Sequence, residues 1–529
     1  MEASGPLGRF LPPVPDGPAR AFLAALDLPG AWVLDPFGAS PRMAVEMARA
    51  GQRVLVSAGN PVARFLLDLA AHPPKEADLQ AALADLAAAR KEDERLETHL
   101  QSVYSTHCTN CERAIPAEAF LWDSKSGEMT GRLYNCSCGS GGEHPATPED
   151  VQRAVSWSRT LGLHRSRALE RVAALDDPDR PFAEEALNIY PPRAVYALGT
   201  VINRLDSISA SDERRRCLTA LLLWAADSTN ALWPHLAERP RPKQLTFPGL
   251  YRENNVWMAL EAGIKAWASE EPVVPLVLWP DEPPETGGIC VFEGPLRELA
   301  FHLDEVPVKA VVGAIPRPNQ AFWTLSALWS GWLWGRAAAA PFKAVLRRRR
   351  YDWQWHGEAL RALFENLGNA ISPQVPFFAL LAESEPSFLS TALLGAQTAG
   401  MELTGLALRS GLALRGEQDV VQIRWRKAQK PRRTGLPLSV GFVRKSLLEY
   451  LKKRREPVPY LHLHAAALAA LARKGMLRWA DDALSTIEKT IIEALLSDEF
   501  VDIERRANPQ SGTWGLRKWH EQTTLKGIE

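Results

Sequence analysis

The stretch Ala31-Trp-Val-Leu-Asp-Pro-Phe-Gly-Ala-Ser-Pro41 is the most informative segment for the fold class. Its first five residues are an apolar run that ends in an acid, and a turn rich in proline and glycine follows. Residues 43–48 continue with the apolar spacing of an amphipathic helix, and Gly51 precedes a second apolar run, rich in valine, at 53–57. Strand, turn, helix and strand form a βαβ unit, and such units build parallel sheets. The sequence therefore predicts an α/β protein.

Five further strand-like runs come late in the chain, at residues 288–292, 310–315, 375–381, 401–408 and 420–425. A helical pattern separates the third of these runs from the fourth. The last two are joined by a polar connection without a helix, as an antiparallel pair would be. Together the two early and five late runs predict one seven-stranded sheet that a long insertion interrupts.

Shifts of pattern divide the chain into five segments. We expect the two halves of the sheet domain at 1–90 and 286–435, a cysteine-containing insertion at 91–147 and a helical insertion at 148–285. Residues 436–529 form a separate, mostly helical tail, whose stretches 500–504 and 511–516 faintly resemble the wing of a winged-helix module.

Composition excludes several classes of protein. The chain has 529 residues, with 62 Lys and Arg against 62 Asp and Glu, so only local clusters of charge can indicate a partner. Residues 1–27 lack the pattern of a secretory signal. The longest uncharged apolar stretch, 321–335, is shorter than the ~20 residues that a membrane-spanning helix needs. We expect a soluble, cytoplasmic protein with no membrane contact.

Four of the six cysteines fall in one short segment and predict a metal site. Cys108-Thr-Asn-Cys111 and Cys136-Ser-Cys138 supply four thiols of the kind that bind zinc tetrahedrally. The second pair is one residue closer than usual, and His107 or His144 could replace a cysteine. A closed four-ligand site is structural, because catalytic zinc keeps an open position. The alternative is four free thiols in a reducing compartment.

The loop at 35–41 is similar to the D-P-F-x-G-x-G loop of adenine and cytosine amino-methyltransferases. The order of cofactor loop, cysteine insertion, helical insertion and late catalytic strand resembles the adenine-specific DNA methylases that carry a zinc ribbon. The likeness covers roughly residues 30–430. It implies a class I methyltransferase fold, S-adenosylmethionine as cofactor, and helicase or ATPase partners in phage-defence or DNA-modification systems. Taken alone, the loop could equally be a turn that ends a strand.

The resemblance also implies the residues of a cofactor site, which are Asp35, Pro36, Phe37, Gly38, Asn60 and Glu293. Ala39 and Pro41 stand where the family has glycines, so a methyl group intrudes at one position and an N–H donor is lost at the other. The acid expected after the second strand is also absent, since Ser57-Ala-Gly-Asn60 stands there. These departures leave the binding of S-adenosylmethionine doubtful.

The family's catalytic motif, [D/N]-P-P-[Y/F], accepts hydrogen bonds from the target amine and stacks on a flipped base. Here the corresponding residues are Ala314, Ile315, Pro316, Arg317, Pro318 and Asn319. Neither the acceptor nor the aromatic ring is present, and Asn319 or Trp323 would substitute only in a shifted register. We expect methyl transfer to be lost.

Basic residues cluster in the late half of the chain and predict contact with DNA phosphates. The candidates are Arg347, Arg348, Arg349, Arg350, Arg424, Arg426, Lys427, Lys430, Arg432 and Arg433. Neighbouring tryptophans at 353 and 355 suit base stacking. The alternatives are solvated helix faces and strand ends, or a docking surface for an acidic partner protein. His462 and His464 could bind a metal from a strand, but a turn into an alanine-rich helix is favoured.

Three functions remain open from the sequence. The first is a catalytically degenerate methyltransferase-like protein that binds DNA or assembles a complex. The second is an active adenine-N6 DNA methyltransferase. The third is a scaffold that contacts proteins alone, and it predicts no salt-dependent binding to duplex DNA.

Overall fold

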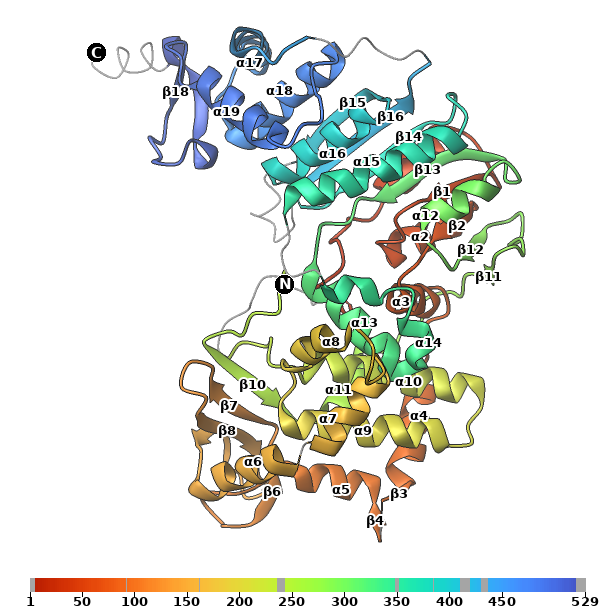
Figure 1. Cartoon of the computed structure of the whole chain (residues 1–529), viewed down its shortest axis with the longest axis vertical. Helices are drawn as coiled ribbons and strands as arrows, with labels where there is room; N and C mark the ends of the chain where they lie inside the picture. Colours follow the sequence, from red (N-terminus) through yellow and green to blue (C-terminus); the bar gives the residue numbers. More distant parts are fainter. Residues whose placement is uncertain are drawn as a thin grey trace.

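The computed structural model describes residues 5–91, 93–160, 162–235, 243–347, 352–383, 385–409, 419–429 and 436–519 (Figure 1). Its central element is an eight-stranded sheet with the order β11-β12-β2-β1-β13-β14-β16-β15. The strands are β1 (Trp32–Asp35), β2 (Arg53–Ser57), β11 (Leu276–Leu278), β12 (Gly288–Phe292), β13 (Val308–Ala314), β14 (Phe377–Leu381), β15 (Met401–Arg409) and β16 (Val420–Lys427).

Both halves of the chain contribute to this one sheet. β1 pairs with β2 on one side and with β13 on the other, and β2 pairs in turn with β12. All pairs from β11 to β14 are parallel, whereas β16 is antiparallel to both β14 and β15. The expectation of a large, mostly parallel sheet that ends in an antiparallel pair is confirmed. The edge strand β11 was not predicted.

Helices cover both faces of the sheet, which explains why its central strands are apolar throughout. Leu34 faces a core shared with α15 (Trp353–Ala370) and α16 (Pro386–Thr398), and the short α12 (Leu296–Leu299) lies on the same side. Val33 points the other way, toward α1 (Pro18–Ala24), α2 (Pro41–Arg49) and part of α3 (Pro61–Ala71). Alternate residues of each strand therefore enter different cores.

A helical region lies below the sheet in Figure 1 and has its own core. Its helices are α4 (Glu76–Ala88), α5 (Leu96–Val103), α6 (Pro148–Thr160), α7 (Gly162–Glu170), α8 (Arg180–Leu187), α9 (Pro192–Ser207), α10 (Asp212–Ser228), α11 (Val256–Trp267), α13 (Gln320–Trp334) and α14 (Arg336–Ala339). The apolar stretch around 321–335 is α13, whose Trp329 is fully buried in this core. Among the residues that the structure describes, no helix combines the length and apolar character needed to cross a membrane.

The cysteine segment forms a small β unit at the lower left of Figure 1. Its strands are β5 (Ser105–His107), β6 (Ala114–Pro116), β7 (Ala119–Asp123), β8 (Met129–Asn135) and β9 (Gly141–Pro145). The later strand β10 (Leu250–Asn254) pairs with β7, so the two insertions share a sheet. A buried bidentate pair between Arg193 on α9 and Glu253 on β10, with N–O distances of 2.8 and 2.7 Å, fixes this β unit to the helices.

The described part of the tail forms a C-terminal unit, drawn in blue in Figure 1. Its elements are α17 (Val440–Arg454), β17 (Val458–Pro459), α18 (Tyr460–Lys474), α19 (Ala483–Leu495), β18 (Phe500–Asp502) and β19 (Thr513–Leu516), and its sheet order is β17-β19-β18. His464 lies inside α18, where its Nε2 is 2.8 Å from Ser390 Oγ of α16. The favoured interpretation of the two histidines, a turn into a helix, is confirmed.

Candidate functional site

Two hairpin turns carry the four cysteines. Cys108 and Cys111 lie between β5 and β6, and Cys136 and Cys138 lie between β8 and β9. The second turn closes tightly, because the N–H of Gly139 donates to the carbonyl of Cys136 at 3.0 Å and Gly139 has a φ of 87°. A glycine at this position accommodates the C-x-C spacing, since L residues rarely adopt such a backbone angle.

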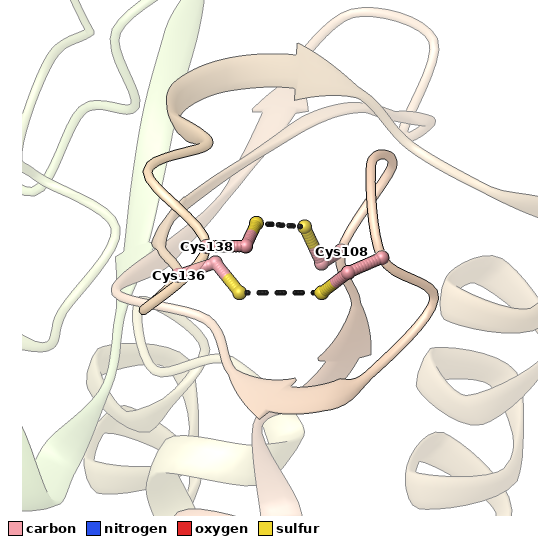
Figure 2. Close-up of side chains that lie close together, drawn as sticks. Cys108, Cys136 and Cys138 are labelled. Atoms are coloured by element: carbon pink, nitrogen blue, oxygen red, sulfur yellow. Dashed lines mark hydrogen bonds between the residues drawn. The ribbon is translucent and has the colours of Figure 1, made fainter.

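The four thiols face one another (Figure 2). The Sγ atoms of Cys108 and Cys138 are 3.5 Å apart, those of Cys111 and Cys136 are 3.6 Å apart, and all four lie within 4.8 Å of each other. Tetrahedral zinc with bonds of about 2.3 Å would separate its sulfur ligands by about 3.8 Å. The predicted cluster is therefore compatible with a structural metal, and it is the single such group of ligands among the described residues.

Backbone N–H groups of the hairpin turns lower the pKa of two thiols toward the thiolate form that metals bind, whereas burial and the neighbouring thiols raise the pKa of Cys111 to about 11. The N–H of Cys111, and after it that of Asn110, lower the pKa of Cys108 to about 6. The N–H of Ser140 likewise lowers the pKa of Cys138. Neither histidine considered as a substitute joins the cluster: His107 is exposed at the end of β5, and His144 stacks on Tyr134 with a ring separation of 4.6 Å.

A buried carboxylate joins the cysteine hairpins to α6. Asp150 accepts hydrogen bonds from Thr106 at 2.9 Å and from Arg132 at 3.2 Å. It also accepts hydrogen bonds from Thr147 and from Arg153. Burial alone would raise the pKa of Asp150, but these hydrogen bonds outweigh burial and lower it. The carboxylate is thus held in its charged form, which fixes the orientation of the hairpins.

A cavity of about 840 Å³ opens at the carboxyl ends of β1, β2, β12 and β13. This is the edge where ligands bind in parallel sheets, at the point where the strand order reverses between β1 and β13. Most of the residues predicted for cofactor binding and catalysis line the cavity, namely Pro36, Phe37, Gly38, Asn60, Glu293, Pro316, Arg317 and Asn319. Aromatic rings complete the wall, including Phe10, Phe322, Trp323 and Phe342, which no cofactor prediction included.

Asp35 lies beneath the loop, fully buried, and is not part of the cavity wall. Its Oδ1 accepts the N–H groups of Phe37 at 3.0 Å and Gly38 at 3.2 Å, while its Oδ2 has no hydrogen-bond partner. Burial raises the pKa of Asp35 to about 7, although these two N–H groups oppose the shift. Gly38 has a φ of 53°, and a Cβ there would lie 2.7 Å from the carbonyl oxygen of Ser57. The carboxyl and the glycine together shape the loop.

The start of α2 offers few free donors to the cavity. Ala39 lines the wall, and the side chain of Ser40 accepts the N–H of Met43 as the helix cap. Pro41 begins the helix and has no N–H. The N–H groups of Phe37 and Gly38 already donate hydrogen bonds to Asp35. They are therefore not free to bind an anionic group of a ligand, as N–H groups at the start of a helix often do.

The polar groups on the β2 side are also largely engaged. The side-chain oxygen of Asn60 caps α3 by accepting the N–H of Val62 at 3.0 Å. Glu293 pairs with Arg64 at 2.5 Å, and Ser57 donates its hydroxyl to the carbonyl of Gly294. The described residues of the cavity therefore fit S-adenosylmethionine poorly, since its ribose hydroxyls and ammonium group find no unpaired carboxylate after β2.

The turn after β13 brings the guanidinium of Arg317 to the cavity wall. Ala314 and Ile315 are buried, so the turn reaches the cavity through Pro316 and Arg317. Arg317 pairs with Glu383 at 3.2 Å and with Glu385. Its guanidinium lies 5.4 Å from the ring centre of Trp353.

Two side chains fix the ends of this turn. The ring of His356 donates to the carbonyl of Pro316, and burial lowers the pKa of His356 to about 3, which keeps the ring neutral. The Asn319 oxygen accepts the N–H of Phe322 at 2.9 Å and caps α13. Both Asn319 and Trp323 line the cavity, but the side-chain oxygen of Asn319 is engaged in the cap.

The predicted basic residues are spread over separate elements. Arg347 ends a 3-10 turn and pairs with Asp179 beside the helical region. On β16, Arg424 is exposed with its guanidinium 5.2 Å from the ring centre of Phe22, and Arg426 pairs with Glu402 at 2.9 Å. Lys427 follows at the end of the same strand. Arg348, Arg349, Arg350, Lys430, Arg432 and Arg433 lie outside the described residues.

Comparison with known proteins identifies no relative. No protein-family model matches the chain, and searches of curated proteins and of solved structures find no match either. The geometry of the cysteine cluster and of the cavity is therefore the basis for assigning a function.

Proposed function

We propose that the chain is a methyltransferase-like protein that has lost its chemistry and serves as a DNA-binding or complex-assembly subunit. Without the edge strand β11, seven strands remain in the order β12-β2-β1-β13-β14-β16-β15. Renumbered 1 to 7 along the chain, this order is 3-2-1-4-5-7-6, and the seventh strand, β16, is antiparallel to both of its neighbours. The resemblance to class I methyltransferases implies a seven-stranded sheet, and these seven strands with their antiparallel terminal pair agree with it. This agreement supports the fold assignment more strongly than any short motif does.

The observation that carries the proposal is the charge network at the turn after β13. Transfer of a methyl group to an amine requires an acceptor for the amine's N–H groups, whereas a guanidinium only donates hydrogen bonds. The carboxylates nearest to Arg317, those of Glu383 and Glu385, are committed to ion pairs with it. The cavity thus persists at the catalytic edge of the sheet without the group that would orient a target adenine.

The cysteine cluster fits zinc in a structural role. The four thiols complete a tetrahedral set, so a bound ion would have no open position for a substrate. When bound, the metal supplies the cross-link between two hairpins that have almost no apolar core of their own: Cys108, Tyr134 and Cys136 form it, with Ile115 packed against them. The hairpins then become a rigid surface for a partner. By the family resemblance, a helicase or ATPase of a phage-defence or DNA-modification system is the kind of partner we propose.

Binding of DNA is the testable part of this function. We expect the full chain to bind a 30-base-pair duplex, with an affinity that falls by at least tenfold between 50 and 200 mM salt, because neutralised phosphates release counterions. Fluorescence anisotropy of a labelled duplex measures this dependence directly. A chain that shows no binding at 50 mM salt would support the alternative of a pure protein scaffold and would refute the DNA-binding role.

A further inference from the structure

The C-terminal unit has the order of elements found in winged-helix modules. α17, β17, α18 and α19 are followed by β18 and β19, and β19 lies between the other two strands. In a helix-turn-helix protein the second helix of the pair enters the major groove. In this unit that helix is α19.

The charge on α19 is unsuited to that role. Its exposed face carries Ser485, Lys489 and Glu493, while Ala483, Ile487 and Ile491 turn inward. The helix itself carries two acidic side chains, Glu488 and Glu493, against one basic side chain, Lys489, and further acids flank it at 481, 482, 498 and 499. This exposed face offers a single cation to phosphates, with an acid beside it, so α19 is a poor candidate for insertion into the groove.

The first helix, α17, has the opposite character. Residues 440–456 contain six basic side chains and two acidic ones. Val443, Leu447 and Leu451 are buried and fix the orientation of the helix. Lys445, Lys452, Lys453 and the C-cap residue Arg455 are exposed, and none of them has an ion pair within 4.0 Å among the described residues. We call these four residues the α17 basic stripe.

The spacing of the α17 basic stripe suits a regular row of phosphates. At about 100° per residue, Lys445 and Lys452 point within about 20° of each other, and they lie about 10 Å apart along the helix axis. Lys453 points about 80° to one side of Lys445, and the C-cap Arg455 adds a cation at the end of the helix, where the helix dipole favours positive charge. The stripe is therefore a rigid, unpaired positive surface on the unit whose α19 is acidic.

We propose that the C-terminal unit contacts the phosphate backbone of duplex DNA through the α17 basic stripe, with α19 outside the groove. This inference rests on the proposed DNA-binding function and names its surface. A contact with phosphates alone does not depend on the base sequence, because phosphate contacts position a protein on DNA whereas base contacts give specificity. A solvated helix face that binds nothing, or a surface for an acidic polypeptide, would make different predictions.

The test compares two variants that each remove three positive charges from the full chain. One is Lys445→Gln/Lys452→Gln/Lys453→Gln on α17, and the matched control is Lys489→Gln/Arg505→Gln/Arg506→Gln on α19 and the wing. Anisotropy titrations with the 30-base-pair duplex are repeated at several salt concentrations. We expect the α17 variant to bind at least tenfold more weakly and its log–log salt slope to fall by about 2.7, at about 0.9 for each lost phosphate contact. The control variant should bind as the parent does.

The outcomes separate the two levels of the proposal. A parent chain that binds no duplex would refute the DNA-binding function itself. A parent that binds, with a weakened control variant and an unchanged α17 variant, would refute the surface and assign it to α19. Polyglutamate that displaces the duplex at equal charge concentration would identify an acidic polypeptide as the partner and would overturn the inference. Circular dichroism of both variants confirms that the helices remain folded.

Discussion

Chelation of the metal from the four-cysteine cluster is expected to unfold the two cysteine turns, residues 107–114 and 135–141, while the sheet of β7, β8 and β10 and the eight-stranded sheet stay intact. The two hairpins share only a minimal core around Cys108, Tyr134 and Cys136, so the metal supplies most of their cohesion. Structural zinc in small domains contributes roughly 10–16 kcal/mol of apparent binding free energy, which becomes folding free energy. We expect one zinc per purified chain by elemental analysis, and proteolytic cleavage within the hairpins after the zinc is removed.

Two cysteine variants make this prediction specific. Cys111→Ser removes a ligand and should abolish zinc retention, whereas Cys217→Ala changes a buried thiol on α10, outside the cluster, and should retain one zinc per chain. If the chelated protein kept protease-resistant hairpins, or if Cys111→Ser retained a full equivalent of zinc, the four thiols would not be a metal site.

Asp35 is expected to make the folded chain less stable as the pH rises from 5 to 8. Its folded pKa of about 7 lies above the ordinary value of 3.8, so the folded state holds a proton that the unfolded state has already released. The stabilisation is therefore complete below pH 3.8 and is lost as the pH passes through 7. A pKa shift of this size lowers the free energy of unfolding by about 4 kcal/mol over its whole pH range. About 2–3 kcal/mol of this loss occurs between pH 5 and 8.

Asp35→Asn isolates this contribution. The amide oxygen can still accept the N–H groups of Phe37 and Gly38, while the titration is removed. Chemical denaturation at each pH gives the difference between variant and parent, in which the pH dependence of His356 and His464 cancels. From pH 5 to 8, the free energy of unfolding of the variant should rise by about 2–3 kcal/mol relative to that of the parent. A difference independent of pH would mean that Asp35 ionises normally in the folded protein.

The parts of the structure that the sequence predicts are those encoded by local pattern. Apolar runs of four to seven residues become buried strands because both faces of the sheet are covered. Such a run predicts a strand even when the neighbouring strands are unknown. The spacing of Cys108 and Cys111 likewise identifies a ligand pair, because one turn of chain brings both thiols to the same side. The lack of a side-chain acceptor in residues 314–318 follows from residue types alone.

Other features depend on contacts between distant segments and leave no local signal. The edge strand β11 is a three-residue run that becomes a strand only because β12 lies beside it. Arg317 is a surface-type residue by sequence, and its role follows from Glu383 and Glu385, more than sixty positions later. The burial of Asp35 beneath its loop follows from the packing of β13, where Gly313 leaves room for its carboxyl. A sequence pattern gives residue types at a site, but it does not give their partners.

Mass spectrometry of DNA bases shows whether the proposed methyltransferase-like chain has lost methyl transfer. The full chain is incubated with S-adenosylmethionine and an adenine-containing duplex at a salt concentration where anisotropy shows that the duplex is bound. The DNA is then hydrolysed and its N6-methyladenine is quantified. We predict no methylated adenine above the level in DNA incubated without the chain. N6-methyladenine that increases with time and with protein concentration would refute the proposed loss of catalysis and identify an active adenine methyltransferase.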